Sequence, residues 1–279
     1  MRGGTLYVVA TPLGHLGDLS VRAAELLRSV PVVAAEDTRR TRVLLDHLGA
    51  TPRLISHHAH SGSRSGAAIL RILEEGKDVA LVSDAGTPAI SDPGAALVAL
   101  VRNAGHAIVP LPGPSAVTTA LSAAGLPADR YVFLGFFPRK GPERARLLER
   151  TAREELTTVI FEAPGRIAEL LRELAEHCGA ERQAVVAREL TKLHEEFRVG
   201  TLGELAARFA AEPEIRGECT VVVQGALHSD ESDDAARAQR ATTRLLAAGV
   251  SRRETASLVS ELFDVSRNAA YQMALEGER

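Results

Sequence analysis

The segment SDAGTPAISDPG at 83–94 has the composition of a ligand-binding loop and directly follows the apolar run VALV. Asp84 offers a hydrogen-bond acceptor and Thr87 a donor. Gly86 lets a ligand approach the backbone closely, and two prolines restrict the loop's conformations. A loop that is ordered in advance loses little entropy on binding. We therefore predict a preformed binding loop, with Asp92 as the N-cap of the following helix. Asp84 could instead cap a turn.

Three other polar loops also follow predicted strands: TPLGHLGD at 11–18, EDTRRT at 36–41 and PLPGPSA at 110–116. Ligands bind at the carboxyl ends of the strands of an open parallel sheet, so all four loops should share one edge. The dinucleotide fingerprint, the P-loop and the nucleophile elbow are all missing from the sequence. The HHAH segment at 57–60 has no acid or cysteine nearby to complete a metal site and is expected to be a surface loop. The residues thus predict a small-molecule cleft with neither a phosphate cradle nor a metal.

The pattern of apolar residues predicts two α/β domains, at 1–113 and 114–227. In the first, strands that are apolar throughout alternate with helices, which is typical of a mostly parallel sheet covered on both faces. In the second, strand patterns such as QAVVAREL and EEFRVGTL follow one another without a helix between them. We therefore expect antiparallel hairpins there, and a mixed sheet.

The end of the chain has a different character. The acidic run HSDESDD at 228–234 is typical of a solvated linker. Residues 235–279 are predicted to form a helical, helix-turn-helix-like module, in which Ser251 and Ser266 cap the second and third helices. Basic residues slightly outnumber acidic ones in this module. It is either a small helical cap on the main body or a module that contacts nucleic acid.

The composition limits the class of protein. The chain of 279 residues is 45% hydrophobic and 25% charged, with no apolar run long enough for a membrane span and no signal-peptide pattern, so we expect a cytoplasmic protein. Cys178 and Cys219 stand far apart without a CxxC motif and are expected to be reduced thiols. A net charge of −3 and only 4% aromatic residues argue mildly against nucleic acid. A local basic surplus at 136–153, with Arg139 and Lys140 in a Pro/Gly loop, is the exception.

Seven segments together resemble one known family: TPLGHLGDLSVRA, AAEDTRRTRVLL, SDAGTPAISDPG, PLPGPSA, FLGFFPRKG, FEAPGRI and RELTKLHEE. They are similar to the bacterial small-subunit rRNA (cytidine-2′-O)-methyltransferases, which belong to the tetrapyrrole-methylase fold class. The resemblance runs from Leu6 to Gly225, and the acidic linker and helical tail also look like the family's C-terminal module. It implies S-adenosylmethionine as methyl donor in a cleft between two α/β domains. It also implies a homodimer that acts on the decoding region of 16S rRNA, in a 30S particle.

The resemblance also implies which residues meet the cofactor. The fold class's cofactor loop matches Asp84, Ala85, Gly86, Thr87 and Pro88, and its Gly-x-Ser turn matches Ser115 and Ala116. Its first-strand loop matches Pro12, and its strand end beside adenine matches Phe161, Glu162 and Ala163. Backbone groups in such loops can bind an uncharged adenosine and a zwitterionic tail without a phosphate site.

Methyl transfer to a ribose hydroxyl requires alignment of oxygen, carbon and sulfur, and help in removing the hydroxyl proton. Only three of the 33 basic residues are lysines, and a lysine, unlike an arginine, can lose its proton. Lys192 is the first candidate, either as a base whose pKa burial lowers or as a cation beside the developing alkoxide. Glu36 and Asp37 are alternative bases, unless the EDTR segment is an internal ion pair.

Contacts with RNA phosphates are predicted for Arg39, Arg139, Lys140 and Arg166. Two other functions stay open at this point: methylation of a tetrapyrrole, and RNA or ribosome binding without catalysis. The basic loop and the helical tail favour the RNA methyltransferase, because a small macrocycle requires neither.

Overall fold

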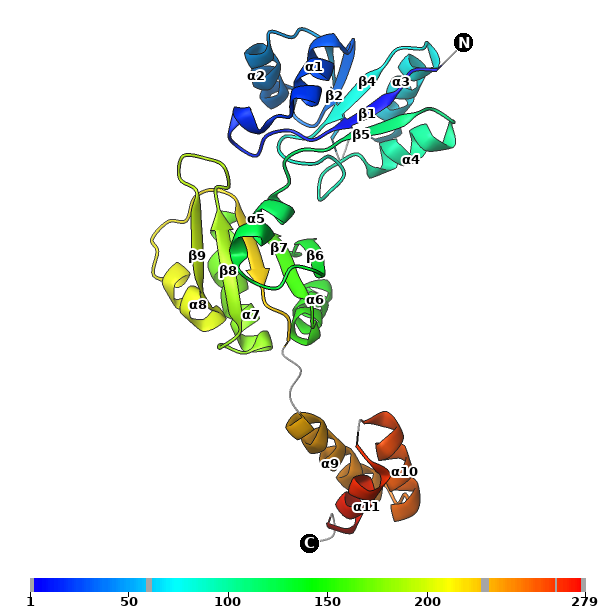
Figure 1. Ribbon diagram of the computed structural model, residues 1–279, viewed down its shortest axis with the longest axis vertical. Helices are drawn as coiled ribbons and strands as arrows, with labels where there is room; N and C mark the ends of the chain where they lie inside the picture. The colour runs from blue at the N-terminus through cyan, green and yellow to red at the C-terminus, as the bar shows by residue number, and fades with distance from the viewer. Residues whose placement is uncertain (1–2, 59–61, 227–230, 264, 277–279) are drawn as a thin grey trace. The chain divides into compact units, whose positions relative to one another are not determined.

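The computed structural model describes residues 3–58, 62–226, 231–263 and 265–276. It divides into two compact units, 1–225 and 226–279. The first unit contains two five-stranded sheets, and the second contains three helices (Figure 1).

The first sheet is parallel and has the strand order β3-β2-β4-β1-β5. Its strands are β1 (Leu6–Val9), β2 (Val32–Ala35), β3 (Arg53–Ser56), β4 (Val79–Val82) and β5 (Ile108–Leu111). The helices between them are α1 (Val21–Ser29), α2 (Thr38–Leu48), α3 (Gly62–Glu74) and α4 (Ala95–Asn103). Strands β2 and β4 are buried along their whole length, which explains their continuous apolar sequences. The predicted parallel sheet is confirmed.

Alternate residues of these strands face two different helix layers. One face packs against α1 and α2 through Leu27, Leu44 and Leu45. The other packs against α3 and α4 through side chains such as Leu73 and Val101. With both faces covered, only the strand ends are open to a ligand.

The second sheet is mixed and has the order β6-β7-β10-β8-β9. Its strands are β6 (Tyr131–Phe136), β7 (Thr157–Glu162), β8 (Gln183–Arg188), β9 (Glu196–Thr201) and β10 (Cys219–Val223). Its helices are α5 (Ala116–Ala124), α6 (Pro142–Arg153), α7 (Ile167–Cys178) and α8 (Leu202–Ala210). The predicted hairpin is confirmed, because β8 and β9 pair antiparallel. Helices α6, α7 and α8 share one core with the sheet, and α5 packs in a second core on it.

Three loops at the edge of the first sheet are tied together by hydrogen bonds. Thr11 and Gly86 exchange two backbone hydrogen bonds, each 2.9 Å long. The Thr87 hydroxyl donates to the carbonyl of Pro114 at 3.1 Å. The loops after β1, β4 and β5 therefore support one another.

One helix start differs from the prediction. Asp92 is not an N-cap: α4 begins after Gly94, whose φ of 142° suits glycine alone, and no side chain caps it. Helix α2 begins at Thr38, with Asp37 as its N-cap. In the HHAH segment, Nδ1 of His57 lies 2.9 Å from the hydroxyl oxygen of Ser65. His60 lies outside the described residues.

The second unit consists of α9 (Glu231–Ala247), α10 (Arg252–Leu262) and α11 (Arg267–Glu276). The predicted caps are confirmed, since Ser251 accepts from the Glu254 N–H and Ser266 from the Ala269 N–H. Residues 231–234 of the predicted acidic linker form the first turn of α9, and 228–230 lie outside the described residues. Within the described ranges, no helix is both long and apolar enough to cross a membrane.

Candidate cofactor cavity and its acidic wall

A cavity of about 300 Å³ lies where loops of the first sheet meet strand ends of the second. Its lining comes from the loop after β1, the start of α2, the loop after β4, the start of α5 and the adjacent ends of β6, β7 and β10: Leu13, Arg40, Asp84, Ala85, Gly86, Thr87, Ile90, Ser91, Asp92, Ser115, Ala116, Val117, Phe136, Phe161, Glu162, Ala163, Pro164, Glu218, Cys219 and Thr220.

The loop after β4 has an unusual backbone. Gly86 has a φ of 79°, and Ala89 and Ser91 also have positive φ, at 69° and 59°. Across the described chain, the other non-glycine residues with positive φ are Glu189 and Thr191, in the loop that carries Lys192. Such conformations cost energy and gather at binding sites, where the surrounding structure enforces them. The two strained loops are therefore the ones expected to meet ligands.

Asp92 is a cavity residue rather than a helix cap. Its pKa is raised to about 6, mainly by burial and next by the nearby charge of Glu36, while a hydrogen bond from Ser83 acts in the opposite direction. The carboxylates of Asp84 and Glu218 add to the rise. Asp92 is thus a carboxyl group whose ionisation would be favoured by a cation placed in the cavity.

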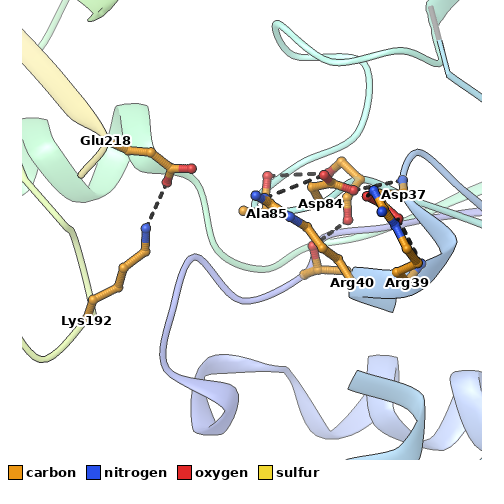
Figure 2. A network of polar contacts seen from close by, with 9 residues as sticks. Asp37, Arg39, Arg40, Asp84, Ala85, Lys192 and Glu218 are labelled. Carbon is orange, nitrogen blue, oxygen red and sulfur yellow. Dashed lines mark hydrogen bonds and ion pairs between the residues drawn. The ribbon is translucent and has the colours of Figure 1, made fainter. Parts of the chain in front are cut away.

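Asp84 joins the loop after β4 to the start of α2 (Figure 2). One carboxylate oxygen accepts the Asp37 backbone N–H at 2.9 Å, and the other lies 3.5 Å from a guanidinium nitrogen of Arg40. Asp37 itself pairs with Arg39 at 2.6 Å. The hydrogen bonds from Arg39 hold the pKa of Asp37 well below its ordinary value. The EDTR segment is therefore an internal ion pair at Asp37 and Arg39, which leaves Arg40 beside the cavity.

The opposite wall contains a buried carboxyl group. Glu162 is 1% exposed and pairs with Arg166, while a nitrogen of Arg144 lies 4.0 Å away. Burial raises the pKa of Glu162, although the Ala163 N–H and both arginines act in the opposite direction. Phe161 makes an edge-on contact with the Phe136 ring, with centroids 5.5 Å apart. This wall thus places the edges of two aromatic rings beside the Glu162 carboxylate, which is fixed by its ion pair with Arg166.

Lys192 is held by two carboxylates, and this overturns the expected direction of its pKa shift. Its ammonium lies 2.9 Å from Glu189. It also lies 3.1 Å from Glu218 (Figure 2). Burial lowers the pKa of Lys192, but hydrogen bonds to both carboxylates outweigh burial and raise it above the ordinary value. Lys192 is therefore a cation at neutral pH. It also packs against Gly14 of the first-strand loop.

Comparison with known proteins gives the family. The family model described as Tetrapyrrole (Corrin/Porphyrin) Methylases matches residues 5–206. A relative from Escherichia coli O157:H7 is 42% identical over 98% of this chain and 95% of its own length. One from Micromonospora olivasterospora is 44% identical over 99% of this chain and 88% of its own length. Both are named ribosomal RNA small subunit methyltransferase I. The chain belongs to this methyltransferase family.

Solved structures support the fold of the methyltransferase. Uroporphyrin III C-methyl transferase from Thermus thermophilus aligns with 79% of this chain and 97% of its own, with a TM-score of 0.58 and 19% identity. Cobalt precorrin-4 methyltransferase aligns over 79% and 94%, with a TM-score of 0.59 and 19% identity. At this level of identity the likeness is one of fold, and it confirms the predicted tetrapyrrole-methylase class.

Most of the cofactor residues predicted for this methyltransferase come together in one place. The cavity is lined by the predicted Asp84, Ala85, Gly86, Thr87, Ser115, Ala116, Phe161, Glu162 and Ala163. Pro12 lines a smaller adjoining cavity, and Pro88 is buried outside both linings. Ser115 stands at the N-cap of α5, where its side chain makes no capping hydrogen bond. Its hydroxyl is thus available to a ligand.

The other predicted site residues of the methyltransferase are not part of the cavity lining. Glu36 and Asp37 are outside its lining, and burial, followed by the charge of Asp84, raises the pKa of Glu36. Arg139 and Lys140 are exposed. Arg144, in the same basic run, is buried against Glu173, so it cannot contribute to a basic surface.

Prediction from the sequence missed Arg40, Asp92 and the segment 218–220 of this methyltransferase. The segment reaches the cavity because β10 lies beside β7, with Cys219 paired to Glu162. Burial raises the pKa of Cys219 to about 12, so its thiol is unreactive at neutral pH. No group of three or more metal-binding side chains occurs among the residues that the structure describes.

Proposed function

We propose that this protein transfers a methyl group from S-adenosylmethionine to the ribose 2′-hydroxyl of a cytidine in small-subunit ribosomal RNA. S-adenosylmethionine-dependent methylation of small-subunit RNA follows from the family. We propose in addition that the acceptor is a ribose 2′-hydroxyl, that the nucleotide is a cytidine and that the substrate is the assembled particle. The proposal also includes action as a homodimer.

The observation that carries the proposal is the charge of the cavity wall. Four carboxyl groups line it, from Asp84, Asp92, Glu162 and Glu218, and the lining contains one guanidinium, that of Arg40. Glu162 is also paired with Arg166, and Glu218 with Lys192, from outside the lining. S-adenosylmethionine carries a sulfonium, an ammonium and a carboxylate, so it is a net cation, and its demethylated product has lost the sulfonium charge. An acidic cavity therefore favours the donor over the product and assists exchange after each turnover.

The remaining lining suits the other parts of the cofactor. The Ser115 hydroxyl and the first N–H groups of α5 can bind a carboxylate. The edges of Phe136 and Phe161 and the small side chains of Ala85 and Ala163 leave a flat apolar space for adenine. These assignments are part of the proposal.

When bound, S-adenosylmethionine supplies an activated methyl group, so this chain's residues have to orient the hydroxyl and remove its proton. Lys192, charged and paired with the cavity residue Glu218, is suited to stabilise negative charge as the proton leaves. Asp37 is a poor proton acceptor because its pKa is held low by Arg39. Glu36, whose pKa is raised, is the better base of the two.

Exposed basic residues are the proposed RNA contacts. Arg139 and Lys140 extend from the loop before α6, and Arg39 has a side chain that is 89% exposed despite its ion pair. Arg166 is more restricted, since it pairs with Glu162 and its side chain is 25% exposed. Phosphate contacts of this kind fix orientation without reading sequence.

The test is labelled methyl transfer to small-subunit particles and to free small-subunit RNA, both prepared without the modification. The expected result is label in RNA, recovered as 2′-O-methylcytidine after digestion to nucleosides. Uroporphyrinogen serves as the alternative acceptor. Label in the macrocycle alone would favour the tetrapyrrole reaction. Cofactor binding with no transfer to any acceptor would favour a non-catalytic RNA-binding protein.

A further inference from the structure

The loop between β8 and β9, residues 189–195, carries Lys192 on an unusual backbone. Glu189 and Thr191 have φ angles of 52° and 63°. A left-handed conformation costs energy in residues other than glycine, and it persists only where the surrounding structure enforces it. The contacts that enforce it therefore indicate what the loop is built to hold.

Glu189 ties this loop to the residue before β10. Its backbone N–H donates to the Glu218 carbonyl at 3.0 Å, and its Oε1 accepts the Glu218 N–H, also at 3.0 Å. The same carboxylate oxygen accepts a hydrogen bond from the Lys192 ammonium at 2.9 Å. Since Glu218 lines the acidic cavity, Glu189 fixes the ammonium of Lys192 to the backbone of the cavity wall.

Gly217 leaves room for this contact. A Cβ at residue 217 would lie 2.3 Å from Cγ and 2.5 Å from Cδ of Glu189, which is far closer than two such carbon atoms can approach. Gly217 also has a φ of 87°, a conformation that favours glycine. The carboxylate of Glu189 therefore lies in a site that is fitted to it.

The two carboxylates beside Lys192 are held to different extents. The side chain of Glu218 is 69% exposed, whereas that of Glu189 is 21% exposed. Burial raises the pKa of Glu189, but hydrogen bonds from Lys192 and from the Glu218 N–H outweigh burial and keep that pKa below its ordinary value. Glu189 is therefore ionised at neutral pH and is the more firmly held partner, so it decides where the ammonium lies.

The loop after β1 holds the other side of Lys192. The His15 backbone N–H donates to the Thr191 hydroxyl at 3.1 Å. A Cβ on Gly14 would lie 2.2 Å from Cγ of Lys192, so the stem of the lysine packs directly on the backbone there. The lysine is thus fixed at its stem by the loop after β1 and at its ammonium by Glu189.

We propose that Glu189 is a positioning residue for methyl transfer, which acts by holding the ammonium of Lys192 beside the acidic cavity. The inference rests on the proposed function, in which Lys192 stabilises negative charge on the acceptor oxygen as its proton leaves. Glu189 lies outside the cavity lining, so it acts through Lys192 and not by contact with the cofactor. Rates are sensitive to such placement, because an error of about 1 Å in the position of a catalytic group can cost about 10²-fold.

The charge of Glu189 has a second effect, on the protonation of Lys192. Burial lowers the pKa of Lys192, but the hydrogen bonds to Glu189 and Glu218 raise it above the ordinary value. Without the charge of Glu189 this pKa falls, since one of the two carboxylates that favour the ammonium form is gone. Substitution of Glu189 leaves the other charged or titratable side chains on the elements around the lysine in place: His15, Asp18, Arg188, His194, Glu195 and Arg216.

The test compares two substitutions of Glu189 with a matched control in the full-length protein. Glu189→Gln keeps an oxygen that can accept from Lys192 but removes the charge, and Glu189→Ala removes both. Glu195→Gln is the control, because it removes the same charge from the same loop, at a carboxylate that accepts the Thr191 N–H at 2.6 Å. Thermal unfolding first establishes that each variant folds as the wild type does.

Kinetics are then measured on unmodified small-subunit particles, and S-adenosylmethionine affinity is measured by calorimetry. Glu189→Ala is expected to lower kcat about 10²-fold, with KM and cofactor affinity within about twofold of the wild type. Glu189→Gln should stay within about tenfold of the wild-type kcat, because the hydrogen bond is kept and Glu218 still favours the ammonium form. Glu195→Gln should change none of these quantities.

Lysine NMR gives a readout that a merely structural role would not move. The chain has three lysines, Lys77, Lys140 and Lys192, so their Cε signals in protein labelled with isotopic lysine can be assigned by single substitutions and titrated one by one. The pKa of Lys192 is expected to fall in Glu189→Gln and to keep its wild-type value in Glu195→Gln. The other two lysines should titrate as in the wild type.

An unchanged pKa of Lys192 in Glu189→Gln would overturn the positioning role. A loss of cofactor affinity in Glu189→Ala as large as the loss of kcat would also overturn it. If the wild type transfers no methyl group to RNA, the proposed function has failed, and this inference with it. Transfer by the wild type with an equal kcat for Glu189→Ala means that this inference alone has failed.

Discussion

Replacing Asp92 by Asn should stabilise the cofactor-free protein at neutral pH. Burial and three neighbouring carboxylates raise the pKa of Asp92 from 3.8 to about 6. Below its ordinary pKa the group is protonated in both the folded and the unfolded chain, and its contribution to stability is fully present. As the pH rises through the folded value, the carboxylate has to ionise in a site that disfavours its charge, and the contribution is lost.

The size of the effect follows from the shift. A rise of about two units at about 1.36 kcal/mol per unit sets an upper limit near 3 kcal/mol. Asp92 is only partly buried and solvent reduces the figure, so we expect a gain of about 1–2 kcal/mol for Asp92→Asn above pH 7. The gain should shrink as the pH falls from 6 to 4, because the wild-type carboxyl group becomes protonated there.

Two measurements test this reasoning. Urea unfolding of wild type and Asp92→Asn, without cofactor, gives the difference in unfolding free energy at several pH values. Calorimetry gives S-adenosylmethionine affinity, which should rise with pH between 5 and 7 in the wild type, because ionised Asp92 attracts the cation. The variant should bind more weakly and lose this pH dependence. A destabilised variant at pH 7.5, or a wild-type affinity independent of pH in this range, would refute the account.

Three further predictions concern the loops around the cavity. Gly86→Ala puts a Cβ on a residue with a φ of 79°, and this Cβ lies 3.3 Å from Leu13 Cδ2. The substitution should lower the free energy of unfolding in urea by about 1–2 kcal/mol and weaken cofactor binding. An unchanged cofactor affinity in calorimetry would contradict this. Lys192→Met should lower kcat by about 10²–10³ with cofactor affinity retained, and Lys192→Arg should recover part of the rate; equal rates for wild type and Lys192→Met would exclude a catalytic role. Replacing Arg139 and Lys140 by Ala should weaken RNA binding and reduce its salt slope by about 1–2, and a filter-binding slope equal to that of the wild type would count against these contacts.

The first sheet could be predicted closely because its local pattern is strong. Strands buried on both faces are continuous apolar runs, and the helices between them carry clear start and stop signals. The strand order of the second sheet could not be predicted in this way. β10, the last of the described strands, lies between β7 and β8, and no local pattern specifies a pairing over that separation.

Pairing between strands that are far apart in the chain also explains the error at Lys192. Glu218 reaches the cavity only through the register of β10 against β7, so both its presence there and its effect on Lys192 were hidden. Without Glu189 and Glu218, burial alone would have lowered the pKa of Lys192. Asp92 was assigned to a helix start because an Asp-Pro pair is typical of one, but the chain turns once more before α4 begins after Gly94.

The central claim is that the acidic cavity between the loop after β4 and the end of β7 is the binding site for a sulfonium nucleoside. The most direct measurement is a crystal structure of the full chain soaked with S-adenosylmethionine. We predict the cofactor in this cavity, with its positive groups against Asp92 and its adenine beside Phe161. A cofactor bound elsewhere, with this cavity empty at saturating concentration, would contradict the account.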